Sequence, residues 1–198
     1  MTPDRLTGRL LLATPDMGDP RFEHAVIFIC QHDEDGAMGV IVNKPLAELD
    51  LGELLDQLEI APREGVRARS VMFGGPVHTE RGVVLHSLDY RLDETMPVTA
   101  DIGLSTTREA LVDLAGLDAA RHPPKNALLA LGYAGWGAGQ LDGELAQNAW
   151  QVCDADPALL FELDRARVWN AAFAKLGVSA AMFSEAWSST GEDDRTVH

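Results

Sequence analysis

Short apolar runs recur along the chain and predict a protein built mainly from β-strands. Such runs, rich in β-branched and aromatic residues and bounded by turn-forming residues, are typical of strands. We expect strands at residues 9–14, 24–32, 37–45, 70–77, 81–87, 126–133 and 149–153.

The two runs at 24–32 and 37–45 predict a β-hairpin at the centre of the fold. They are joined by "DEDG", whose Asp and Gly residues favour a turn, and the second run ends at a proline. Both arms are almost continuously apolar, which is typical of strands covered on both faces. We therefore expect Ile27, Ile29, Val40 and Val42 to be nearly inaccessible to solvent.

Helical periodicity marks four segments, which are residues 51–60, 105–116, 138–148 and 164–176. In the second segment, Ser105 or Thr106 is placed to cap the N-terminus, and Glu109 completes a capping box. Gly116 follows as a stop signal.

The order of strands and helices predicts the fold class. It lacks the regular β-α alternation of a doubly wound sheet and favours an α+β fold with a bent, largely antiparallel sheet and flanking helices. Residues 1–187 are expected to form one domain, and residues 188–198 an acidic, flexible tail.

Composition narrows the classes of function. A formal net charge of −15 disfavours direct nucleic-acid binding, and no run reaches the roughly 20 apolar residues of a membrane span. Cys30 and Cys153 are expected to be buried thiols. With no signal-peptide pattern at the N-terminus, the chain is interpreted as cytoplasmic.

The segment "YAGWGAGQLDGEL" (133–145) places Trp136 among glycines between a strand and a helix. Its G-x-G-x-G spacing differs from nucleotide-binding fingerprints, so we interpret the glycines as permitting a sharp turn after a strand that ends near Tyr133. Trp136 is then expected to pack against "NKP" (43–45) or "FGGP" (73–76).

Histidine and cysteine give no strong sign of a metal or of catalysis. Cys30, His32 and His86 could meet only if their strands were neighbours, so no metal and no cofactor is predicted. His86 and Ser87 are adjacent on a strand and point to opposite faces, so they cannot form a catalytic pair without a β-bulge. No catalytic residue is assigned.

Three blocks of sequence resemble a known family. The blocks "LLLATPDMGDPRFEHAVIFICQHDEDGAMGVIVNKPL", "FGGPVHTERGVVLHS" and "LGYAGWGAGQLDGELAQNAW" resemble the YqgE/AlgH family of bacterial proteins, over about Gly8 to Met182. The resemblance implies a branched, strongly bent sheet that forms a pseudo-barrel with helices around it, in a cytosolic bacterial protein. It also implies a link to transcriptional regulation for some members, and no established catalytic residues.

Two functional hypotheses follow. The first is a non-enzymatic regulatory or binding module, which would act through an unknown protein partner or small ligand because the chain has no helix-turn-helix pattern. Its candidate binding residues are Asn43, Lys44, Gly74, Gly75, Arg81, His86, Trp136 and Gln140. The alternative is an enzyme of unrecognised type that uses His32, Asn43, Arg81, His86 and Gln140.

Overall fold

The structure is a computed structural model, described here for residues 6–63, 65–67, 69–116 and 121–178. Its strands are β1 (Arg9–Ala13), β2 (Val26–Asp33), β3 (Gly36–Ile41), β4 (Pro45–Asp50), β5 (Ser70–Phe73), β6 (Val77–Ser87), β7 (Met96–Pro97), β8 (Ile102–Ser105), β9 (Ala127–Gly137) and β10 (Trp150–Asp154). Its helices are α1 (Leu51–Gln57), α2 (Arg108–Leu114), α3 (Gln140–Ala146), the π-helical turn η1 (Ala158–Glu162) and α4 (Arg165–Lys175). The predicted tail, residues 188–198, lies outside the described residues.

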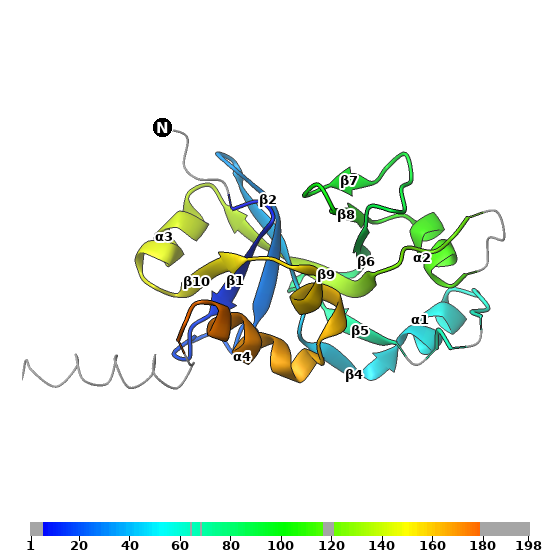
Figure 1. Ribbon diagram of the computed structural model, residues 1–198, viewed down its shortest axis with the longest axis horizontal. Helices are drawn as coiled ribbons and strands as arrows, with labels where there is room; N and C mark the ends of the chain where they lie inside the picture. The colour runs from blue at the N-terminus through cyan, green and yellow to red at the C-terminus, as the bar shows by residue number, and fades with distance from the viewer. Residues whose placement is uncertain (1–5, 64, 68, 117–120, 179–198) are drawn as a thin grey trace, which may run out of the picture.

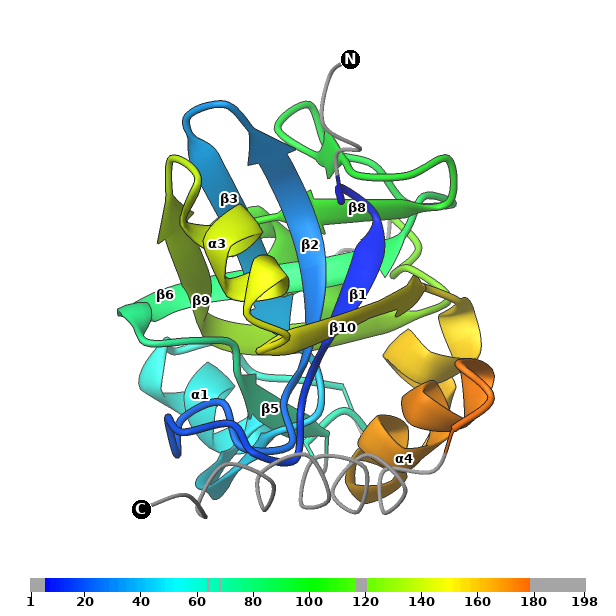
Figure 2. The same cartoon turned by 90° about the vertical axis from the view of Figure 1, so that its left-hand side faces the viewer.

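The strands form one strongly bent, branched sheet, as predicted. Its main path runs β10-β1-β2-β3-β9-β6-β8-β7, and every pair along that path is antiparallel. The branch lies on the long strand β9, which pairs with β3 through residues 134–137 and with β5, in parallel, through residues 129–131. Figure 2 shows β1 to β3 crossing β6 and β9 steeply, which gives the sheet its half-barrel shape.

The β2–β3 hairpin is confirmed as a central and largely buried element. Ile27, Ile29, Val40 and Val42 have no exposed surface. Alternate residues of β2 serve two different apolar clusters, with Phe28 in one and Ile27 in the other. Both faces of the hairpin are therefore covered, as its continuous apolar sequence requires.

The helices lie outside the sheet and close its open faces (Figure 1). Leu141 of α3 packs on the cluster that contains Ile27, and Phe173 of α4 packs on the cluster that contains Phe28. A third apolar cluster joins α1 and α2 to β5 and β9 through Leu55 and other side chains. This layered arrangement leaves cavities where three or more elements meet.

Several predicted boundaries are wrong for local reasons. Pro45 begins strand β4 instead of ending the run before it, a position that suits proline because it needs no ladder donor. Ser105 is the last residue of β8, and α2 is capped by Thr107, whose hydroxyl accepts a hydrogen bond from Ala110 N. The strand expected to end near Tyr133 continues to Gly137.

Within the described ranges, no helix is both long and apolar enough to cross a bilayer.

Candidate functional site

A cluster around Trp136, here called the tryptophan clasp, joins β9 to α3 and β10. It consists of Trp136, Gln140, Glu144 and Trp150. The two indole rings meet edge to face with centroids 6.1 Å apart, and both donate their Nε1–H to Glu144 Oε2, at 2.9 Å from Trp136 and 2.7 Å from Trp150. Gln140 Nε2 donates to the other carboxylate oxygen at 3.0 Å, and Gln140 Oε1 accepts from Gly137 N.

The clasp shows the surroundings of Trp136. Trp136 is only 7% exposed, which agrees with a packing role; it meets Trp150 edge to face and belongs to an apolar cluster with Leu141, against which Phe73 of "FGGP" also packs. The sharp turn comes later, at Gly139, which is left-handed with φ 69° and precedes α3. Gln140 and Glu144, four residues apart on α3, were the sequence signal for one contact of this cluster, whereas Trp136 and Trp150 lie on strands before and after the helix.

The "FGGP" block meets β9 earlier, through close backbone contact. A Cβ atom placed on Gly74 would lie 2.2 Å from Gly132 O, and one on Gly75 would lie 2.1 Å from the Tyr133 carbonyl carbon. Gly75 also has φ 149°, which side chains rarely adopt. The two glycines are therefore needed for this close backbone contact, and the Gly74 amide donates to Leu131 O of β9 at 2.8 Å.

Asn43 and Lys44 lie at the end of the central hairpin. Asn43 Oδ1 accepts from Val26 N and Asn43 Nδ2 donates to His24 O, both at 2.8 Å, so the side chain closes the β2 entry loop. Lys44 lines a cavity of about 310 Å³ beside Trp169, and its partial burial lowers the pKa of the ammonium group. Asn43 thus has a structural role, and Lys44 borders a hollow.

His86 belongs to a buried polar network between β6 and β8. Its Nδ1 lies 3.1 Å from Ser87 O, which can only accept, so this nitrogen carries the proton. Nε2 then accepts from Ser105 Oγ at 2.9 Å, and Ser105 Oγ lies 2.9 Å from Thr95 Oγ1. His86 is 0% exposed and Ser105 is 1% exposed. Sequence reasoning missed Ser105 because it placed this serine at a helix cap.

The buried His86 gives a testable pH dependence. Burial lowers the pKa of His86 below its ordinary 6.5, so the folded protein resists the proton that the unfolded chain accepts. We expect the free energy of unfolding to fall as the pH drops below about 6.5. Urea denaturation at several pH values measures this slope. His86→Gln removes the titrating group and should flatten the slope, whereas identical slopes in both proteins would contradict the assignment.

The remaining candidates are placed separately. Arg81 is exposed on β6, while His32 is buried and accepts a hydrogen bond from Leu6 N at 3.3 Å. Cys30 and Cys153 are buried as expected, and burial raises the pKa of Cys153 to about 11. Among the described residues, no cluster of three or more His, Cys, Asp or Glu side chains could hold a metal ion.

The structure thus distributes the predicted site residues over several places instead of gathering them in one concave site. Trp136 and Gln140 are in the clasp, His86 is in the β6–β8 network, and Asn43 and Lys44 are at the hairpin end. Each of the polar side chains His86, Asn43 and Gln140 already has hydrogen-bond partners within the fold.

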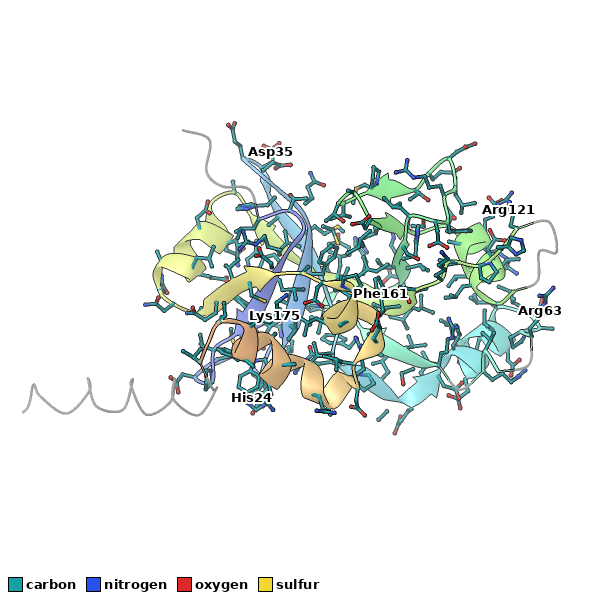
Figure 3. All side chains as sticks on the ribbon, viewed as in Figure 1. His24, Asp35, Arg63, Arg121, Phe161 and Lys175 are labelled. Atoms are coloured by element: carbon teal, nitrogen blue, oxygen red, sulfur yellow. The ribbon has the colours of Figure 1, made fainter. Side chains whose placement is uncertain are left out.

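A cavity that sequence reasoning missed lies where β5, the start of β9 and η1 meet. We call it the basic cavity; it encloses about 360 Å³ and is bordered by Arg69, Ser70, Lys125, Asn126 and Arg165 over an apolar floor. Phe161 of η1, labelled in Figure 3, lines it close to β9. Its residues come from segments far apart in the sequence, so no local motif could have revealed it.

Comparison with known proteins agrees with this architecture. A family model described as AlgH-like matches residues 10–181. A UPF0301 protein of Caulobacter vibrioides is 48% identical over 176 residues, which cover 88% of this chain and 89% of the relative. A UPF0301 protein of Rhodospirillum rubrum is 43% identical over 180 residues, 91% of this chain and 92% of the relative.

Solved structures show the same fold. The solution structure of the AlgH protein from Pseudomonas aeruginosa superposes with a TM-score of 0.76 at 36% identity, covering 100% of this chain and 98% of the other. A crystal structure of a Corynebacterium diphtheriae protein, at 19% identity and a TM-score of 0.66, covers 93% of this chain and 99% of the other and shares the fold. This chain belongs to the AlgH-like family.

Proposed function

We propose that this chain is a non-enzymatic regulatory module that works in the bacterial cytosol by binding a small ligand or a protein partner. The supporting observation is the separation of the polar residues in the three family blocks. The side chains that take part in catalysis must lie within reach of one reacting atom. His86, Asn43 and Gln140 instead hold three different parts of the fold together.

A role linked to transcription would pass through a partner or a ligand. The chain has 31 acidic residues against 16 basic ones, and this excess opposes approach to the phosphate backbone of DNA. Arg67, in the most basic stretch of the sequence, is bound to Asp56 by two hydrogen bonds of 2.8 and 2.6 Å. That arginine is therefore already neutralised.

One contact favours the enzymatic alternative. Ser105 Oγ donates to His86 Nε2, and a backbone carbonyl fixes the histidine tautomer, which is the arrangement of an activated serine nucleophile. Both residues are buried, however, and neither lines any of the cavities described here. A substrate carbonyl would have to reach a serine of which only 1% is exposed.

Labelling with a fluorophosphonate distinguishes a non-enzymatic binding module from an enzyme that uses Ser105. In a serine hydrolase the serine oxygen displaces fluoride from phosphorus, and the adduct adds the mass of the phosphonyl group. We expect the native protein to keep its unmodified mass while a serine hydrolase in the same tube is fully labelled. An adduct that appears on the native chain and disappears in Ser105→Ala would overturn the proposal and establish an enzyme.

A further inference from the structure

The basic cavity combines a ligand-sized volume with an apolar floor. Its volume of about 360 Å³ lies within the range of roughly 300–1,000 Å³ that is usual for small-molecule sites. The floor is made by side chains from α1, β5, α2, β9 and η1, namely Leu51, Met72, Leu114, Leu129, Leu160 and Phe161. Because these elements are held by the main sheet and its helices, the cavity is formed before a ligand arrives.

The charges around this cavity have the sign opposite to that of the protein. Three of its lining residues, Arg69, Lys125 and Arg165, are cationic and none is acidic, in a chain with 31 acidic and 16 basic residues. Three other cavities each include a carboxylate: Asp16 in one, Asp33 with Asp35 in another, and Glu23 in the cavity that Lys44 and the other side of Arg165 line. Figure 3 shows Asp35 at the tip of the β2–β3 hairpin, well away from Phe161.

Arg165 keeps its positive charge at the wall of the cavity. Its guanidinium donates to main-chain carbonyl oxygens, at 2.8 Å to Leu160, 3.2 Å to Val42 and 3.0 Å to Leu163. These acceptors are neutral, so the hydrogen bonds fix the side chain without cancelling its charge, which only the neighbouring carboxylate of Asp164 partly balances. A partly buried cation in this situation favours a nearby anion.

The geometry points to a binding site for a small organic anion with an apolar part, and specifically for a medium-chain aliphatic carboxylate. The carboxylate would lie between Arg69 and Lys125, where Ser70 and Asn126 offer further hydrogen bonds. The aliphatic chain would cover the partly buried side chains of Ala127 and Phe161. This inference rests on the proposed binding function and names the class of ligand.

Octanoate is a suitable probe, followed by ¹H–¹⁵N NMR of the full chain. We expect saturable shifts of the amide signals of Ser70, Lys125 and Phe161. Arg69→Ala and Lys125→Ala should each weaken binding about tenfold, since each removes one charge-assisted contact. Arg91→Ala removes the same charge from an exposed loop outside the cavity and should leave the affinity unchanged.

Two further probes test charge and apolar character separately. Octylamine, with the same chain and the opposite charge, and inorganic phosphate, with charge and no chain, should both leave these signals in place. Unmoved signals with octanoate, equal binding of octylamine, or unchanged affinity in Arg69→Ala and Lys125→Ala would each overturn the inference. Any of these results would exclude the aliphatic carboxylate as ligand and leave the proposed binding function standing. The binding function itself is overturned by fluorophosphonate labelling at Ser105.

Discussion

Trp136→Ala is expected to lower the free energy of unfolding by about 3–5 kcal/mol, the cost typical of removing a large buried aromatic side chain. The indole fills the space between β9, α3 and β10 against Trp150, and its loss also leaves Glu144 with one donor fewer. A cavity in this position cannot close, because the neighbouring strands are held by the sheet. Urea denaturation followed by circular dichroism measures the change.

Gly137→Ser, one residue further along the same strand, is the matched control. Gly137 is exposed, and a Cβ atom there would have only Gln140 Oε1 as a neighbour, at 4.0 Å. We expect a change within about 0.5 kcal/mol, as for other exposed sites. No gain from helix capping is expected, because Gly139 is the N-cap of α3. An unchanged midpoint in Trp136→Ala would contradict the packing role of the clasp.

Gly75→Ala is expected to be the most damaging small substitution, costing more than about 3 kcal/mol of stability or abolishing soluble protein. The added methyl group would overlap the Tyr133 carbonyl carbon at 2.1 Å, and φ at this residue is 149°. The Tyr133 carbonyl carbon belongs to the backbone of β9, and the methyl group would be fixed to the backbone of "FGGP", so neither can move away without breaking the contact between the two segments. Thermal denaturation and soluble yield report the effect.

Gly135→Ala is the matched control for Gly75→Ala, because it adds the same methyl group at a glycine that has no close backbone neighbour. Its nearest neighbour would be a side-chain atom of Tyr133 at 3.6 Å, which is ordinary van der Waals contact. We expect this variant to melt close to the wild type. Equal melting temperatures for Gly75→Ala and Gly135→Ala would show that the two layers are not in tight contact at Gly75.

The pattern of apolar and polar residues predicted those elements whose form depends on neighbouring residues in the sequence. The β2–β3 hairpin follows from its unbroken apolar arms, and α4 begins at Arg165 after Asp164, whose side chain accepts from Ala166 N. Pro45 misled the prediction because proline is compatible with the first position of a strand as well as with a strand end. The choice between the two depends on pairing with β5, which lies further along the chain.

The candidate sites were harder to predict, because they depend on contacts between distant segments. Glycine-rich blocks were read as turns or ligand loops, yet Gly74 and Gly75 are needed where another strand approaches, at Gly132 and Tyr133. The basic cavity takes Arg69, Lys125 and Arg165 from three separate segments. The cluster of positive charge arises only in the folded protein, where the sheet brings these three residues together.

The most direct test of the account is a complementation experiment in a bacterium from which the gene has been deleted, with the transcript profile as the readout. The account predicts that the deletion changes the profile, that Ser105→Ala restores it, and that the double variant Arg69→Ala/Lys125→Ala fails to restore it at equal protein level. A profile unaffected by the deletion would contradict a regulatory role. Failure of well-folded Ser105→Ala, with full restoration by the double variant, would instead show that the function resides in the buried serine and histidine.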